Sequence, residues 1–308
     1  MKEAALVPDA QPRSYYGHPV IKEPVWTWEI PLYFFSGGLA GASAGLAWGA
    51  ELRGNERLAR RAWQVALGAV AASPALLISD LGKPQRFLNM FRMLKVTSPM
   101  SVGSWLLGLA GGAITAAAAD AHIGAIPGGR AARAAAAVLG LPVATYTGAL
   151  VANTSVPVWH EARHELPVLF AAGAAASAGA AAAATLEPEH AAPARRLAIG
   201  GAVAEVTTAQ VMERRLGKLA EPYHQGPAGA LSKVATGLTI GGGALLAAAG
   251  RRREAATAGG CLVLAGALAE RWSVFRAGFQ SARDPRYTVG PQRERVRAGG
   301  TQGTARRA

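Results

Sequence analysis

The sequence predicts an all-α integral membrane protein with eight transmembrane helices. Of its 308 residues, 51% are hydrophobic and only 17% are charged. The apolar residues form blocks of about 20, the length that crosses a bilayer as a helix, and short connectors rich in Arg, Pro or Gly separate them. Many blocks consist mostly of Ala and Gly, and such small residues allow helices to approach closely inside a membrane bundle.

Eight blocks are long enough to span the membrane. We expect them at residues 30–50, 62–79, 102–119, 132–152, 167–186, 195–212, 229–249 and 255–272. An even number of spans places both termini on one side, and the first span is expected to serve as the insertion signal. Lys and Arg are more numerous on that side, chiefly because of the two tails, so the positive-inside rule predicts cytoplasmic termini in the cell membrane.

The composition argues against several functional classes. The net charge of +13 lies in connectors and the C-terminal tail, as membrane topology requires, rather than in a nucleic-acid-binding surface. The single cysteine, Cys261, cannot hold an iron–sulfur cluster by itself. All six histidines fall in arms, connectors or span ends, so no mid-span pair is available to ligate haem. We therefore predict no redox metal, and any electrons must pass through an organic cofactor or a partner.

Two connectors have distinctive compositions. Residues 80–101 alternate Lys and Arg with Phe, Leu and Met, which predicts an amphipathic helix on the membrane surface or beneath a partner protein. Residues 153–166 are rich in side chains that titrate or form hydrogen bonds.

The start of the first span is the first candidate site. Trp28, Glu29 and Tyr33 follow Trp26, and Glu29 lies close to hydrocarbon, where an acid is costly unless it has a partner or a function. Glu29 and Tyr33 are four residues apart and share a helix face. They could offer a proton acceptor and a hydroxyl donor beside an aromatic wall. The alternative is an interfacial anchor with a hydrated carboxylate.

Tyr146, within the fourth span, is the second candidate because a buried phenol needs a hydrogen-bond partner and could donate to a carbonyl ligand. A core tyrosine bonded to nearby backbone would explain it equally well.

Four further residues are candidates for a proton relay or for the roof of a pocket: Asp80, Trp159, His160 and Glu205. Asp80 could instead pair with Lys83 or Arg86 at a helix end, which we favour. Glu205 lies inside the sixth span, where an acid is a functional-site hypothesis by default, although an interhelical hydrogen bond could explain it. No metal site is predicted.

Four segments carry a resemblance to a known family. They are WTWEIPLYFFSGGLAG (26–41), SDLGKPQRFLNMFRMLKVTSPMSVGSW (79–105), YTGALVANTSVPVWHEARHELP (146–167) and ERWSVFRAGFQSARDPRYTVGPQRER (270–295). Through them the chain resembles the NrfD/polysulfide reductase membrane-subunit family, of the actinobacterial type found beside formate-dehydrogenase-like proteins.

The resemblance implies eight helices arranged as two four-helix bundles. It predicts an N-terminal arm at 1–29, a first bundle at 30–152 that holds a quinone site, a second bundle at 153–272 and a basic tail at 273–308.

It also implies a function. Such a subunit binds menaquinone or another quinone and exchanges electrons with a four-cluster iron–sulfur subunit, which serves a molybdopterin catalytic subunit. The implied quinone site here comprises Trp28, Glu29, Tyr33 and Tyr146, with Tyr146 donating to a quinone carbonyl and Glu29 exchanging protons. The chain would carry no catalytic metal of its own. The rival hypothesis is a membrane anchor, or a small-solute or ion transporter, without quinone chemistry.

Overall fold

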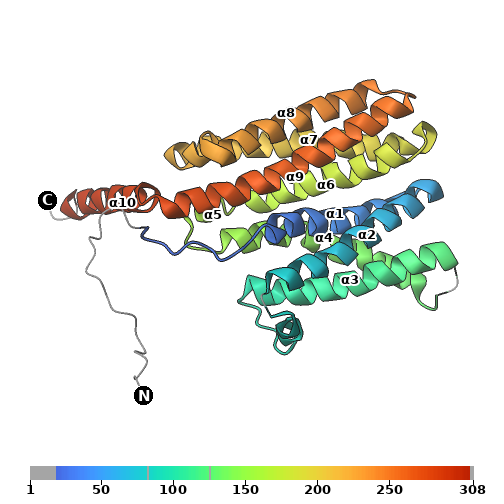
Figure 1. Ribbon diagram of the computed structural model, residues 1–308, viewed down its shortest axis with the longest axis horizontal. Coiled ribbons are helices and arrows are strands. Elements are labelled where there is room, and N and C mark those ends of the chain that lie inside the picture. Colours follow the sequence, from blue (N-terminus) through green and yellow to red (C-terminus); the bar gives the residue numbers. More distant parts are fainter. Residues whose placement is uncertain (1–18, 82, 125, 306–308) are drawn as a thin grey trace, which may run out of the picture.

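A computed structural model describes residues 19–81, 83–124 and 126–305, together with the side chains of this part except those of 295 and 297–305. The described chain is helical and contains no strand (Figure 1). Its elements are α1 (Glu29–Glu51), α2 (Glu56–Asp80), η1 (Pro84–Phe91), α3 (Pro99–Ile123), α4 (Gly129–Ala152), α5 (Pro157–Glu161), α6 (Leu166–Thr185), α7 (Pro188–Leu216), η2 (Gly217–Tyr223), α8 (Gly226–Ala248), α9 (Arg253–Arg283) and α10 (Arg286–Ala305).

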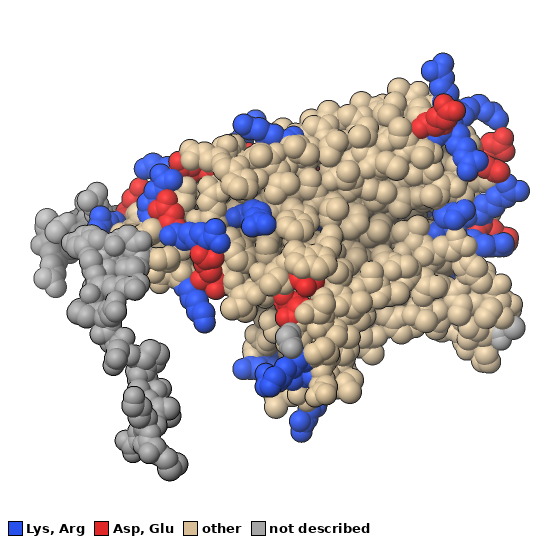
Figure 2. Space-filling view, in the orientation of Figure 1, with Lys and Arg blue, Asp and Glu red and all other residues tan. Residues whose placement is uncertain are grey.

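Each expected span lies within one long helix to within one residue. Six helices in the described part, α1, α2, α3, α4, α6 and α8, are long and apolar enough to cross a membrane. The remaining two, α7 and α9, carry internal charged residues, among them Glu205, Glu270 and Arg271. Figure 2 shows charged side chains gathered toward the two ends of the helices, with a broad uncharged belt between them on this face.

The long helices pack in two sets, α1 to α4 and α6 to α9, each formed by helices that follow one another in the chain. α1 contacts α2 and α4, and α3 contacts α2 and α4, whereas α6 contacts α7 and α9, and α8 contacts α7 and α9. α6 also contacts α1 and α4, so α6 joins the two sets of helices, as Figure 1 shows.

The closest approach in the first set is between α1 and α4. A Cβ atom added at Gly41 would lie 2.3 Å from the carbonyl oxygen of Gly140, and one added at Gly140 would lie 2.5 Å from that of Gly41. The two backbones therefore touch, which only glycine permits. Tyr33 lies roughly two turns before Gly41, and Tyr146 lies roughly two turns after Gly140. Because the helices run antiparallel, this crossing brings both tyrosines to the same end.

The amphipathic connector differs from its prediction. Residues 84–91 form the short 3₁₀ helix η1 instead of an amphipathic α-helix, with Pro84 in its first turn and no buried residue. Leu88, Met93 and Val96 are more than two-thirds exposed, so this connector covers the end of the helices without entering the core.

The last long helix continues beyond the expected start of the C-terminal tail. α9 extends to Arg283, and Ser273, Val274 and Phe275 are buried against neighbouring helices. Arg283 Nε donates to Glu23 Oε1 at 2.7 Å, which places residue 23 and the end of α9 at the same end of the molecule.

Replacing Gly41 with Ala should lower the free energy of unfolding by roughly 1–3 kcal/mol, because the added methyl group forces the two backbones apart. Thermal unfolding of the purified protein in lipid nanodiscs measures the effect. Gly45→Ala on the same helix is the control, since no atom lies within 4 Å of its added Cβ. Equal stability of the two variants would contradict the packing described for α1 and α4.

Candidate functional site

One cavity brings together three of the residues expected at a site. It has a volume of about 120 Å³ and lies at the end where α1 begins and α2 ends. Its lining residues are Trp26, Ile30, Tyr33, Phe34, Leu77, Asp80, Leu81, Met90, Met100, Gly103, Ser104, Leu107, Tyr146 and Leu150. We call it the tyrosine pocket. Of the predicted residues, Tyr33, Tyr146 and Asp80 meet here.

Tyr33 is the most deeply buried polar group of the tyrosine pocket. Its side chain is 2% exposed, and its phenol oxygen has no hydrogen-bond partner in the described part of the chain. Leaving a buried donor unpaired costs about 1–3 kcal/mol. The phenol is therefore available to a ligand that brings an acceptor into the pocket.

Tyr146 reaches the tyrosine pocket because α3 has a glycine beside it. A Cβ atom added at Gly103 would lie 2.3 Å from Cε2 of the Tyr146 ring. The ring thus fills the space that a side chain at 103 would occupy, and both residues line the pocket. Sequence inspection identified Tyr146 but gave no sign that Gly103 on another helix positions it.

Asp80 and Glu29 are joined by one threonine. Oδ1 of Asp80 accepts hydrogen bonds from the backbone N–H of Thr27 at 3.2 Å and from its hydroxyl at 2.8 Å. The same hydroxyl contacts Oε2 of Glu29. The hydroxyl of Thr27 therefore lies between the two carboxyl groups.

Asp80 lines the tyrosine pocket, whereas Glu29, although only 8% exposed, does not. The expected pairing of Asp80 with Lys83 or Arg86 is wrong within the described residues: Asp80 is held by Thr27.

Trp26 lines the tyrosine pocket in place of Trp28, which was the tryptophan expected there. Trp28 is 56% exposed and lies outside the tyrosine pocket, while Trp26 lines it. Ile30, Tyr33 and Phe34 share one face of α1, whereas Trp26 precedes the helix, so helical spacing could not have selected it.

Trp159 supports Trp26 from behind. The two rings stack with centroids 5.8 Å apart and an interplanar angle of 30°. Trp159 is fully buried and donates from Nε1 to the carbonyl of Val274 at 2.8 Å. Its neighbour His160 is exposed and does not line the pocket. Of the residues predicted for a roof, Trp159 thus contacts the pocket only through Trp26, and His160 does not line it.

An apolar groove of about 350 Å³ adjoins the tyrosine pocket. It shares Leu77, Met90, Ser104 and Leu107 with the pocket. It continues between α2 and α3 beneath Phe87 and Phe91 of η1. Gly108, Gly111 and Gly112 on α3 line it. The combined shape suits a ligand with a compact polar head and a long apolar chain.

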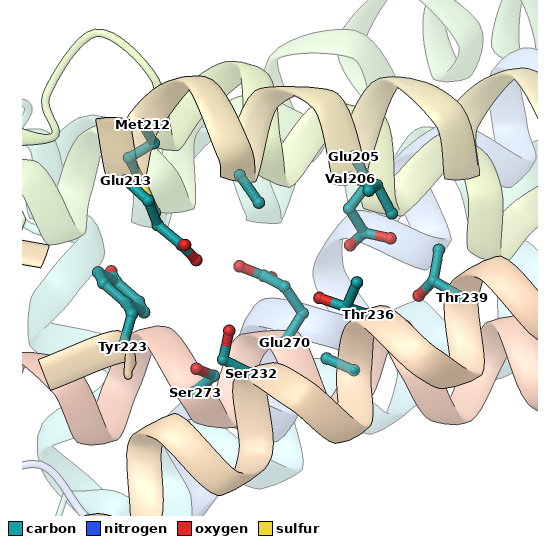
Figure 3. Close-up of a pocket in the computed structure, with 12 residues that line it drawn as sticks. Glu205, Val206, Met212, Glu213, Tyr223, Ser232, Thr236, Thr239, Glu270 and Ser273 are labelled. Carbon is teal, nitrogen blue, oxygen red and sulfur yellow. The ribbon is translucent and has the colours of Figure 1, made fainter. Parts of the chain in front are cut away.

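Glu205 does not line the tyrosine pocket. It lines a small cavity between α7, α8 and α9 together with Glu213, Tyr223 and Glu270 (Figure 3). Sequence analysis missed Glu270 and Arg271, which it took for the end of the last span. Their position within a helix-length block beside apolar residues was the available signal. Within the described residues, no group of three or more His, Cys, Asp or Glu side chains is arranged to hold a metal ion.

Comparison with known protein families gives a match over most of the chain. The model of a polysulfide reductase family, NrfD_2, matches residues 13–283, which include every residue of the tyrosine pocket. No curated protein shows significant similarity to the chain.

Replacing Thr27 with Val should destabilise the entrance of α1, because Asp80 and Glu29 lose the hydroxyl that lies between them. We expect a loss of about 1.5–3 kcal/mol, the usual range for a hydrogen bond to a charged group. The midpoint of thermal unfolding measures it. Thr185→Val is the matched control, since that exposed hydroxyl bonds only to backbone carbonyls of its own helix. An unchanged midpoint for Thr27→Val would argue against the carboxyl–hydroxyl–carboxyl link.

Proposed function

We propose that this chain, which belongs to the NrfD-type polysulfide reductase family, is the quinone-binding membrane anchor subunit of an oxidoreductase complex. Members of the family are membrane subunits of polysulfide-reductase-like complexes. The observation that carries the proposal is the tyrosine pocket, where the unpartnered phenol of Tyr33, Tyr146 and Asp80 meet beside an apolar groove.

The pocket and groove fit a quinone in chemical character. A quinone has carbonyl acceptors on a flat ring and carries an apolar isoprenoid chain. Tyr33 and Tyr146 would hold the head group by donating hydrogen bonds, and the groove between α2 and α3 would hold the chain. When bound, menaquinone would act as the carrier of two electrons and two protons, which the protein itself lacks among its described residues.

The residues of this chain then have distinct tasks. Trp26, Phe34 and Met90 contribute apolar surface that keeps water away from the head group. Asp80 accepts or releases a proton at the pocket wall, because a change in redox state changes the basicity of the quinone oxygens. Thr27 and Glu29 lie behind Asp80 and pass protons between it and the entrance of α1. Glu29, which we expected beside the quinone, is therefore separated from the pocket by Thr27 and Asp80.

The complex would contain a four-cluster iron–sulfur subunit and a molybdopterin catalytic subunit of formate-dehydrogenase-like type. We place the iron–sulfur subunit at the end of the molecule that holds the tyrosine pocket, so that electrons need cross only a short distance. The exposed apolar and basic side chains of residues 83–96 and residues 19–28 of the N-terminal arm lie at this end.

The membrane arrangement that we propose has eight spans in two four-helix bundles, α1–α4 and α6–α9, in the cell membrane with cytoplasmic termini. It adds α7 and α9 to the six helices that are apolar enough by composition. The support is that α7 and α9 pack along α6 and α8, and that their buried charges face one another inside the second bundle.

The rival transporter hypothesis would be favoured by broken helices, because transporter sites commonly use discontinuous helices. In the structure α2 runs through Pro74 and α4 runs through Pro142 without interruption. A plain anchor would not need the unpartnered phenol of Tyr33 in a cavity.

Tyr33→Phe, Tyr146→Phe and Asp80→Asn should each reduce quinone-linked turnover of the assembled complex by about tenfold or more. Each removes a hydrogen bond or a proton acceptor worth about 1.5–3 kcal/mol when a charged or polar partner depends on it. Turnover is measured in membranes with a menaquinol analogue and compared with turnover on a soluble dye, which bypasses this subunit.

Tyr287→Phe and Asp284→Asn are the controls, because these residues bond to Glu221 and Arg286 outside the pocket. Wild-type quinone turnover in all three pocket variants would refute the proposed site.

Gly112→Leu tests the path of the isoprenoid chain. No atom lies within 4 Å of a Cβ added at Gly112, so the larger side chain enters the groove without disturbing the helix. We expect a higher KM for long-chain menaquinol and an unchanged KM for a short-chain analogue. Equal KM changes for both substrates would mean that the chain does not occupy this groove. Gly237→Leu, which also has open space around it, serves as the control.

A further inference from the structure

A second cluster of buried charges lies away from the tyrosine pocket, among α6, α7 and α9. Glu205 is 2% exposed, Glu270 is 9% exposed and Arg271 is 2% exposed. Charged side chains at this depth are costly, so they are retained where they pair or perform a function. Gly173 on α6 makes room for them, since a Cβ there would lie 2.1 Å from Oε1 of Glu205.

The two carboxyl groups compete for one guanidinium. Arg271 Nη1 contacts Glu270 Oε2 and lies 3.7 Å from Glu205 Oε1, beyond hydrogen-bond distance. Its Nη2 donates to the carbonyl of Phe170 at 2.9 Å, and its guanidinium lies 4.1 Å from the centre of the Phe170 ring. Both carboxyl oxygens of Glu205 therefore have no hydrogen-bond partner within the described part of the chain.

A small polar cavity lies directly beside Glu205. Figure 3 shows the carboxyl groups of Glu205, Glu213 and Glu270 pointing into the space between α7 and the facing helices. The cavity has a volume of about 30 Å³, which is enough for a water molecule. Its other polar lining is made of hydroxyl groups, from Tyr223 of η2, Ser232, Thr236 and Thr239 of α8, and Ser273 of α9.

The cavity leads toward one aqueous surface. Nε2 of His224 lies 3.6 Å from Oε2 of Glu213, and the His224 side chain is 59% exposed. Glu213 therefore stands between solvent and the cavity. Glu205 is farther in, roughly three turns, or about 16 Å, from the C-terminal end of α7. Tyr223 is buried with an unpartnered hydroxyl, and burial, with the nearby Glu270 and Glu213, raises the pKa of its phenol well above the usual value. This phenol thus stays a hydrogen-bond donor.

The charges do not balance unless a proton is present. Of the three carboxyl groups that face the cavity, Glu213 lies beside His224, whereas Glu205 and Glu270 have the single cation Arg271 between them. The other polar groups around this inner pair are the Phe170 carbonyl of α6 and the hydroxyls of α8. In a low-dielectric interior an unpaired carboxylate becomes neutral by binding a proton. We propose that Glu205 and Glu270 form a proton-binding site, in which one proton resides on Glu205 and exchanges with the aqueous phase through Glu213 and His224.

A metal cation fits this place less well. The positive guanidinium of Arg271 already lies against the two inner carboxyl groups, and it would repel a second cation. The cavity also holds little more than one water molecule. A proton needs neither a coordination shell nor more room.

The proton-binding site is separate from the tyrosine pocket. Phe170, which carries Arg271 on its face, packs against Phe34 with centroids 5.6 Å apart, and Phe34 lines the tyrosine pocket. Aromatic rings without exchangeable protons thus divide the two places. The inference therefore holds whether or not a quinone binds in the tyrosine pocket.

Infrared spectroscopy of the full chain in lipid nanodiscs tests the site. At neutral pH the wild type should show the carbonyl stretch of a protonated carboxylic acid, and this band should shift in D₂O. Glu205→Gln should remove it. Glu187→Gln, which changes an exposed acid at the start of the same helix, should leave it intact. A wild type without the band, or a band that survives in Glu205→Gln, would overturn the proposal.

Two further variants keep the test decisive. Glu205→Asp retains a carboxyl group, so its band should persist at a shifted frequency even if Glu205→Gln does not fold. Glu270→Gln should abolish the band, because Arg271 is then free to pair with an ionised Glu205. A band that persists in Glu270→Gln would contradict the shared guanidinium. A band that vanishes when Na⁺ replaces choline in the buffer would show a cation site instead.

The route from solvent has its own measurement. Glu213→Gln and His224→Gln should slow hydrogen–deuterium exchange of the Glu205 band by about tenfold or more, since each removes a group that can relay a proton. Glu221→Gln, an acid of the same surface that does not line the cavity, should leave the rate unchanged. Wild-type exchange rates in both route variants would refute this path.

Discussion

The contact between the backbones of Gly41 and Gly140 is the constraint on which the tyrosine pocket depends. Two residues without side chains let α1 and α4 touch, and the antiparallel crossing then sets where the ends of these helices meet. Tyr33 and Tyr146 lie on the same side of the crossing, and Gly103 on α3 provides the space that the ring of Tyr146 occupies. Small residues thus determine the position of large ones, as expected where van der Waals packing holds membrane helices together.

The bilayer explains why charged groups gather in so few places. Most charged side chains lie at the two ends of the helices, and the belt between them is nearly free of charge on the face shown in Figure 2. Two pairs of acidic side chains each lie beside one shared neighbour. At the helix ends, Asp80 and Glu29 both contact the hydroxyl of Thr27. Within the second set of helices, Arg271 contacts Glu270 and lies 3.7 Å from Glu205, whose carboxyl oxygens have no hydrogen-bond partner in the described part of the chain.

The two acidic pairs differ in their surroundings and hence in their proposed roles. Asp80 lines a pocket that continues into an apolar groove, which suits proton exchange with an amphipathic ligand. Glu205 faces a water-sized cavity lined by hydroxyls, which suits storage of a proton. Phe34 and Phe170 stand between the two places. Proton exchange at one place can therefore proceed without a direct proton path to the other, while the packed rings keep both at fixed separation.

The sequence by itself determined the long apolar helices, the absence of mid-span histidines and the candidacy of Tyr33, Tyr146, Asp80 and Glu205, because length, hydropathy and charge at depth are local properties. Only the tertiary structure decided which of these residues meet. It placed Asp80 rather than Glu29 at the pocket wall, where Asp80 accepts hydrogen bonds from Thr27, 53 positions away in the chain. It also placed Trp26 rather than Trp28 at the pocket and left His160 exposed. In the second set of helices it brought Glu205 close to Glu270 and Arg271. Such contacts depend on how helices far apart in the chain cross one another, and hydrophobic periodicity within one helix carries no information about that crossing.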